Sequence, residues 1–334
     1  MRQSDGAPAV RGIPTASAAA ALAGSARWRW WEFVLLACAL LSWFLLPGYA
    51  LLLNEIAILA LFALSLDLVL GYAGIVSLGH AAFFGLGAYA AALFAKHLVA
   101  DPLTGLAVAI AASALLGLAS SVLILRGSDL TRLMVTLGIA SIFYELANRL
   151  DWLTGGADGL QGVVMGPLLG RFEFDLYGRT AYAYSLLVLF AALLFSRRLV
   201  HSPFGLSLQA LRDNPLRAAG IGLSVPRRLV AVYTIAAGIA GAAGALLAQT
   251  SGFASLDVLE FHRSADVLLV LVIGGAGYLY GGIVGAVAFK LLHDAISILT
   301  PQYWTFWLGL FLVVLVLIGR DRLMRPWTWF RRHP

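Results

Sequence analysis

Long apolar segments separated by short polar turns recur along almost the whole chain, and this pattern constrains the fold more than any motif. Hydrophobic residues make up 61% of the sequence and charged residues only 12%, about half the charged share of a soluble globular chain. Backbone groups in lipid must pair within their own segment, so a bilayer is crossed by helices of about 20 apolar residues. The sequence therefore predicts an all-α, polytopic membrane protein.

The apolar pattern predicts about ten transmembrane helices, two of them next to Gly-rich breaks. An unbroken helix from Asp266 to Leu299 would hold 34 residues, far more than the roughly 20 that a bilayer needs. The glycine pairs in that run are its only breakers, so we expect two helices there. In chain order the expected helices are Phe33–Leu46, Ala50–Leu70, Ala81–Lys96, Leu103–Leu125, Leu133–Leu150, Ala181–Phe195, Leu229–Thr250, Asp266–Tyr278, Gly282–Leu299 and Tyr303–Ile318.

The distribution of Lys and Arg predicts the orientation. With ten helices and a cytoplasmic N-terminus, 17 basic residues fall on cytoplasmic segments and four on periplasmic ones, as the positive-inside rule requires. We therefore expect both termini in the cytoplasm. Residues 1–31 are expected to form a disordered cytoplasmic tail that ends in a basic and aromatic interface belt, residues 32–320 the transmembrane domain, and residues 321–334 a basic cytoplasmic tail.

A polar island from Pro203 to Arg228 interrupts the apolar pattern, within the longer cytoplasmic loop 197–228. It carries several arginines, among them Arg212 and Arg217, against the single acid Asp213. An ordinary basic loop that obeys the positive-inside rule is one interpretation. The alternative is a structured surface on which another protein docks.

The local sequence of this island favours the docking surface, because it predicts two capped short helices. Phe204, Leu208 and Leu211 have i, i+4, i+7 spacing, which predicts the apolar face of an amphipathic helix. Asn214 before a proline predicts the end of that helix and the cap of a second one. The second helix is expected to run to about residue 221 and to end at Gly222, which tolerates a left-handed conformation.

The sequence shows no motif for an enzyme, a metal site or a bound cofactor. It has no G-x-x-x-x-G-K-[ST], H-E-x-x-H, G-x-S-x-G or C-x-x-C pattern, and its six His are scattered. The one cysteine, Cys38, permits neither a disulfide nor a Cys-based metal site within the chain. The formal charge of +6 comes from Arg at helix ends, so we expect no nucleic-acid partner.

Candidates for a translocation path are polar or irregular positions at membrane depth. Ionisable residues there face the bundle interior or a cavity, and irregular backbone survives only where protein or a wet cavity satisfies it. The alternatives are structural hydrogen bonding, subunit contacts and close helix packing through small residues. The candidates are Asp67, Gly71, Gly74, Ser77, His80, Glu145, Gly274, Gly275 and Gly277.

Four segments together resemble the permeases of branched-chain amino-acid ABC transporters, most closely the LivM-type subunit. The first is LSLDLVLGYAGIVSLGHAAFFGLGAYAAAL, Leu64 to Leu93. The others are residues 135–163, the loop at Arg212-Asp213-Asn214, and LVIGGAGYLYGGIVGA, residues 271–286. The resemblance covers about residues 50 to 319.

The resemblance implies a permease subunit of an ABC importer in a bacterial inner membrane. Its expected partners are a homologous permease, two cytoplasmic ATPases that bind the ATP, and a periplasmic solute-binding protein. The expected solute is a branched-chain amino acid or a similar small polar solute, with urea or short amides as alternatives. The loop after the sixth helix would dock on the ATPase, through Phe204, Leu208, Leu211, Arg212, Asp213, Asn214, Arg217 and Gly222.

The sequence departs from this family at four positions. Pro215 and Ala219 stand where the family's docking loop usually carries Glu, Asp67 stands where an amide is common, and Ile75 stands where Gln is common. Two other classes of function therefore remain as alternatives to the ABC importer. One is an ion-coupled secondary transporter with Asp67 or Glu145 as proton carrier, and the other is a membrane assembly factor that transports nothing.

Overall fold

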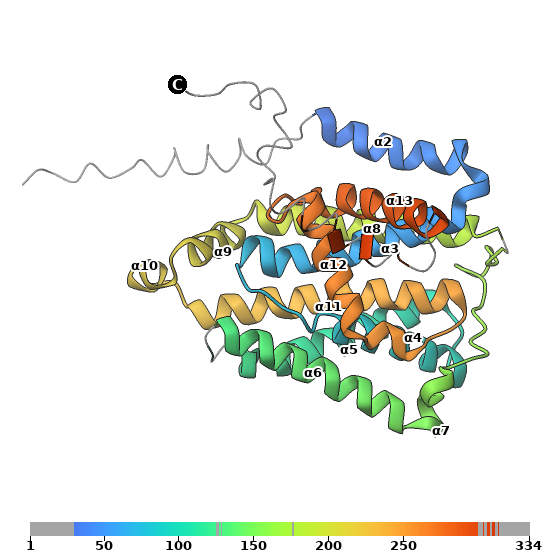
Figure 1. Cartoon of the computed structure of the whole chain (residues 1–334), viewed down its shortest axis with the longest axis horizontal. Coiled ribbons are helices and arrows are strands. Elements are labelled where there is room, and N and C mark those ends of the chain that lie inside the picture. Colours follow the sequence, from blue (N-terminus) through green and yellow to red (C-terminus); the bar gives the residue numbers. More distant parts are fainter. Residues whose placement is uncertain are drawn as a thin grey trace, which may run out of the picture.

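The computed structural model describes residues 30–124, 127, 129–175 and 177–299, together with the single positions 303, 306, 307, 309, 310 and 313. Every regular element in this described part is helical (Figure 1), which agrees with the predicted all-α class. Helix α2 begins at Trp30, inside the predicted belt. The remainder of the N-terminal tail, the C-terminal tail and most of the tenth predicted helix lie outside the described residues.

The first nine predicted helices each correspond to one helix of the structure. These are α2 (Trp30–Leu45), α3 (Ala50–Asp67), α4 (Ala81–His97), α5 (Pro102–Ile124), α6 (Asp129–Arg149), α8 (Arg179–Val200), α11 (Val225–Ser251), α12 (Phe261–Gly274) and α13 (Gly281–Leu299). Within the described residues, six helical segments are long and apolar enough to cross a membrane. The count of ten stays a prediction.

Short elements join the long helices. They are the helices α7 (Asp151–Thr154), α9 (Pro203–Asp213) and α10 (Pro215–Gly220), the 3-10 turns η1 (Pro47–Tyr49), η3 (Gly156–Asp158) and η4 (Leu256–Leu259), and the π-helical turn η2 (Leu68–Tyr72). In Figure 1, α9 and α10 lie at one end of the bundle and α7 lies at the opposite end. The connections that matter for function are thus at the two ends.

Helices α3 and α11 form the centre of the bundle. In both, 78% of the most apolar window is buried within the chain, against 17% in α6. Helix α11 packs against α3, α4 and α5, and glycines permit the close approach. A Cβ at Gly241 would collide with the side chain of Ser113 on α5, and one at Gly244 with the carbonyl of Phe84 on α4. Small residues at such contacts let helix backbones pack tightly in a membrane.

The first Gly-rich break, residues 71–79, follows α3 directly. Helix α3 widens into the π-turn η2 and then gives way to irregular backbone before α4. Other elements satisfy that backbone: Leu78 N donates to Thr136 Oγ1 at 3.3 Å and Ala81 N donates to Ser264 Oγ at 2.9 Å. The predicted irregular segment is therefore confirmed, and side chains from α6 and α12 provide the partners that water cannot provide in lipid.

The second break, residues 274–282, separates α12 from α13 as predicted. The predicted end of the eighth helix near Tyr278 is wrong, because α12 already ends at Gly274. The next residue, Gly275, has φ of +97°, a conformation that glycine adopts without strain and that stops the helix. A Cβ at Gly274 would collide with the carbonyl of Gly281, so the two helices cross backbone to backbone.

Candidate functional site

The segment between α8 and α11 forms the two capped helices that the sequence predicts. Ser202 Oγ accepts a hydrogen bond from Phe204 N at 3.2 Å and caps α9. Asn214 Oδ1 accepts from Arg217 N at 3.0 Å and caps α10. Gly222 follows with φ of +87°, which fits a left-handed residue after a helix. The predicted roles of Asn214 and Gly222 in the local structure are confirmed.

One face of α9 is anchored in the bundle. Leu208 is fully buried and Leu211 is 3% exposed, so these apolar residues pack inward. Phe204 is half-buried, and the guanidinium of Arg228 lies over its ring at 5.4 Å from the centroid. The amphipathic spacing therefore describes how α9 attaches to the permease rather than the surface that it presents.

The outward surface of this segment consists of other residues, which the sequence reasoning missed. Leu216 and Ile221 are 86% and 77% exposed, and Leu206 of α9 is 45% exposed. Arg217 and Asp213 are exposed beside them. The signal was present in the sequence, because Leu216 and Ile221 are the large apolar residues within an otherwise polar stretch. We call Leu206, Leu216, Arg217 and Ile221 the outward face.

Arg212, at the last turn of α9, contacts both Gly-rich breaks. Its Nη1 donates a hydrogen bond to the carbonyl of Gly71 in η2. Its Cγ lies 3.0 Å from where a Cβ of Gly74 would be, and its Nη1 lies 3.1 Å from where a Cβ of Gly277 would be. One side chain of the predicted docking segment therefore bridges two breaks that are about 200 residues apart in sequence.

A direct contact also joins the two breaks. The fully buried Asp67 accepts a hydrogen bond through Oδ1 from Gly277 N at 2.7 Å. A Cβ at Gly71 would collide with both the Asp67 carboxylate and Gly277 N, so only glycine permits this approach. We call Asp67, Gly71, Arg212 and Gly277 the coupling junction.

The coupling junction suits the transmission of movement. A carboxylate and a guanidinium hold backbone groups by charge-assisted hydrogen bonds, which are stronger than neutral ones. Tightly packed contacts are exchanged between discrete arrangements rather than deformed continuously. A displacement of α9 would therefore act on the end of α3 and on the α12–α13 turn at the same time.

The remaining candidates of the first break, Ser77 and His80, are packed against neighbouring side chains in the interior of the bundle. The ring of His80 stacks on Phe62 with centroids 5.6 Å apart, and its Nε2 is 2.9 Å from Ser65 Oγ. His80 and Ser77 are both fully buried. Of the nine candidates, the structure brings Asp67, Gly71, Gly74 and Gly277 together, and it places Gly274 and Gly275 at the adjoining helix crossing.

Glu145 lies apart from all of these residues. It sits on α6, where it forms an ion pair with Arg149 one turn later. Both side chains are about half exposed or more, at 49% and 78% respectively. The contacts of Glu145 are therefore local to a peripheral helix, and they do not connect it to either break.

A buried ion pair that the sequence reasoning missed holds the base of the docking segment. Arg197 Nη2, in the last turn of α8, lies 3.1 Å from Glu32 Oε2 on α2, and both side chains are less than one-tenth exposed. Tyr280, from the α12–α13 turn, interacts electrostatically with both residues. A lone acid at the start of an apolar helix was the available signal, because such a charge needs a partner at membrane depth.

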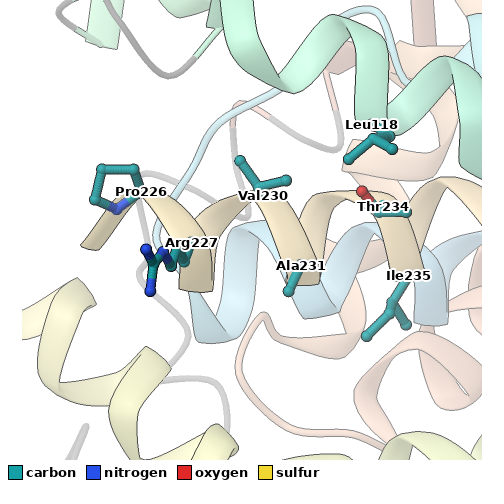
Figure 2. Close-up of a pocket in the computed structure, with 7 residues that line it drawn as sticks. All are labelled: Leu118, Pro226, Arg227, Val230, Ala231, Thr234 and Ile235. Atoms are coloured by element: carbon teal, nitrogen blue, oxygen red, sulfur yellow. The ribbon is translucent and has the colours of Figure 1, made fainter. Parts of the chain in front are cut away.

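No group of three or more His, Cys, Asp or Glu side chains within the described part of the chain is arranged to hold a metal ion. An apolar groove of about 560 Å³ lies between α5 and α11, close to the docking segment (Figure 2). Leu118, Val230 and Ile235 line it, and Arg227 lies at its edge. None of the predicted path residues contributes to this groove, so it is distinct from the coupling junction.

Comparisons with known proteins show which family the chain resembles in sequence. A family model described as "Branched-chain amino acid transport system / permease component" matches residues 48–319. The chain is 32% identical to the "High-affinity branched-chain amino acid transport system permease protein LivM" of Salmonella typhimurium, over 79% of this chain and 67% of the relative. It is 31% identical to the protein of the same name from Escherichia coli over the same shares. No solved structure matches the chain.

A more distant relative has a different name. The "Fructose import permease protein FrcC" of Rhizobium meliloti is 26% identical over 81% of this chain and 77% of the relative. The similarity thus extends over most of the chain to permeases that are named for chemically different solutes.

Proposed function

The chain belongs to the family of permease components of branched-chain amino acid transport systems and is a permease subunit of an ABC importer. From this premise we propose a mechanism by which it moves its solute. The protein is a multi-pass protein of the inner membrane. Its solute is a branched-chain amino acid or a similar small polar solute. The observation that supports the mechanism below is that Arg212 of α9 contacts both Gly-rich breaks.

We propose that the end of the bundle with α9 and α10 faces the cytoplasm. The loop 197–228 carries six of the arginines, and the bias of 17 basic residues against four supports both termini on that side. The solute would arrive at the opposite end, from a periplasmic binding protein. A homologous permease would complete the transmembrane path.

The outward face is the proposed contact with a cytoplasmic ATPase. Leu216 and Ile221 are large, apolar and exposed, and exposed apolar patches rimmed by polar residues are typical of interaction sites. Arginines surround them, and Pro215 and Ala219 contribute no acid. The ATPase that fits this surface has an apolar cleft with an acidic rim, because buried charges need partners of opposite sign. Two ATPases, one for each permease, would bind and hydrolyse the ATP.

The movement would pass through the coupling junction in one step. When the ATPases close, they displace α10 and α9 as a unit, because Leu208 and Leu211 fix α9 to the bundle and Asn214 fixes α10 to α9. Arg212 carries that displacement to the carbonyl of Gly71. Asp67 passes it to the α12–α13 turn through Gly277 N. Helices α3, α12 and α13 then shift together between outward and inward arrangements.

The contacts of the two acids weigh against an ion-coupled carrier. A proton carrier must exchange its proton with water on both sides of the membrane. Asp67 is fully buried and its Oδ1 accepts from Gly277 N, while Glu145 pairs with Arg149 on a peripheral helix. These contacts give each acid a structural partner, which supports the ATP-driven mechanism.

The test is uptake by the complete complex in proteoliposomes that contain ATP. Leucine uptake should require internal ATP and the binding protein, and it should persist after a protonophore collapses the pH gradient. Uptake by this chain alone, driven by a pH gradient and abolished in Asp67→Asn, would instead establish the ion-coupled carrier.

A further inference from the structure

A second polar site lies at the end of the bundle away from the docking segment. Helix α11 begins beside that segment and its 27 residues span about 40 Å at 1.5 Å per residue. Just beyond its end, the carbonyl of Ala254 accepts a hydrogen bond from Leu160 N at 2.7 Å. Leu160 lines a pocket of about 350 Å³ between the end of α4 and the turn after α7. We call this the outer pocket (compare the position of α7 in Figure 1).

The outer pocket is lined by charges of both signs. Lys96 and His97 come from the last turn of α4, and on the other side Asp151 begins α7 and Asp158 ends η3. Lys96 Nζ donates one hydrogen bond, to the carbonyl of Gln161 at 3.2 Å, and an ammonium group has three N–H donors.

These opposite charges line one pocket without neutralising one another. The ion pairs formed among the described residues involve neither Lys96 nor Asp151 nor Asp158. The pocket volume is at the lower end of the roughly 300–1,000 Å³ that small-molecule sites occupy. A small ligand that itself carries both a positive and a negative group would complement this lining.

We propose that the outer pocket is a receiving site for a small zwitterion, in which Lys96 binds the ligand carboxylate and Asp151 and Asp158 bind its ammonium group. This inference rests on the proposed function, and it narrows the solute class to free amino acids. Binding at this site would be weak, because exposed ion pairs contribute little binding energy. A solute released by a binding protein would therefore stay in the outer pocket only briefly before it moves on along the path.

The experiment uses the complete permease–ATPase complex in lipid nanodiscs, without the binding protein. Saturation-transfer NMR would measure the binding of leucine, of 4-methylpentanoate, which lacks the ammonium group, and of 3-methylbutylamine, which lacks the carboxylate. Leucine should bind more tightly than either analogue. Lys96→Gln should weaken leucine roughly two- to fivefold and leave 3-methylbutylamine unchanged. Asp158→Asn should weaken leucine by a similar factor and leave 4-methylpentanoate unchanged.

The matched control is Arg171→Gln, which removes an exposed positive charge from the same loop but outside the pocket, and it should leave leucine binding unaltered. Equal binding of leucine and both analogues would overturn the inference. The inference would also be overturned if Lys96→Gln and Asp158→Asn changed only the concentration of binding protein needed for uptake, because the pocket would then be a docking surface for that protein. If either of these results were obtained while ATP-driven leucine uptake persisted, the proposed function would still hold. Absence of leucine uptake by the wild-type complex would overturn both the inference and the proposed function.

Discussion

Asp67 Oδ1 accepts a hydrogen bond from Gly277 N at 2.7 Å, across 210 positions of sequence. This contact ties the end of α3 to the turn between α12 and α13 at the point where Arg212 reaches in from α9. Two irregular segments and one docking segment thus meet at a single junction, in which Asp67 and Gly71 are buried and Arg212 is exposed.

Replacing Asp67 should separate the acceptor role of its carboxylate from its charge. Asp67→Asn keeps an oxygen that can accept from Gly277 N, so we expect ATP-driven uptake to persist. Asp67→Ala leaves that partly buried N–H without this acceptor, which costs up to about 1–3 kcal/mol, and should lower both uptake and the thermal stability of the complex. Uptake rates and a melting curve for each variant are the measurements. Loss of uptake in Asp67→Asn at unchanged stability would contradict the acceptor role.

Gly71→Ala should disrupt the junction by steric overlap. The added methyl group would collide with the Asp67 carboxylate and Gly277 N, and overpacking of this kind costs about 1–3 kcal/mol. Gly138→Ala on α6 is the matched control, since a Cβ there meets nothing within 4 Å. We expect Gly71→Ala to reduce uptake and Gly138→Ala to leave it at the wild-type rate. Equal behaviour of the two variants would show that the close approach is not needed.

Glu32 and Arg197 should depend on one another. Removing one partner of a buried ion pair costs about 3–5 kcal/mol, because the other charge stays buried. Glu32→Gln and Arg197→Gln should therefore each reduce stability and uptake. The double exchange Glu32→Arg with Arg197→Glu should recover part of both. The exposed pair Glu145–Arg149 provides the control, and its single variants should change neither quantity. If the double exchange were no more stable and no more active in uptake than the single variants, pairing of Glu32 with Arg197 would be contradicted.

Leu216→Ser should weaken the ATPase contact without affecting the permease itself. The side chain is 86% exposed, so the substitution leaves the bundle packing intact. Truncation of an apolar anchor at an interface costs about 1–2 kcal/mol, which corresponds to roughly five- to thirtyfold weaker association. Titration of the ATPase against the permease in nanodiscs measures this. Val164→Ser, 75% exposed at the opposite end, is the control, and equal affinity of both variants would place the ATPase elsewhere.

Local features of this protein were predictable from sequence, because each depends on neighbouring residues. The apolar spacing predicted nine helices of the described part, Asn214 before Pro215 predicted a cap, and Gly222 predicted a helix end. The two breaks were recognisable from their glycines. Even the early end of α12 has a local cause, since Gly275, directly after its last residue, takes a positive φ.

The joining of these features was not predictable, because it depends on tertiary packing. Nothing near Asp67 in the sequence indicates that its partner is the nitrogen of Gly277. The spacing of Leu208 and Leu211 predicted an apolar face, but only the position of α8 and α11 decides that this face points inward. The partner of Glu32 is likewise set by where α8 ends. Periodicity identifies which residues share a face, and the packing identifies what that face contacts.

The most direct test of the coupling junction is ATP hydrolysis by the reconstituted complex with Arg212→Ala. Basal hydrolysis and assembly with the ATPases should be retained, because Leu216 and Ile221 remain in place. Stimulation of hydrolysis by the solute-loaded binding protein should fall by about tenfold, as expected for the loss of a charge-assisted hydrogen bond. Arg198→Ala, which removes an exposed arginine from the last turn of α8 just before the docking segment, should keep full stimulation. Full stimulation in Arg212→Ala would contradict the account.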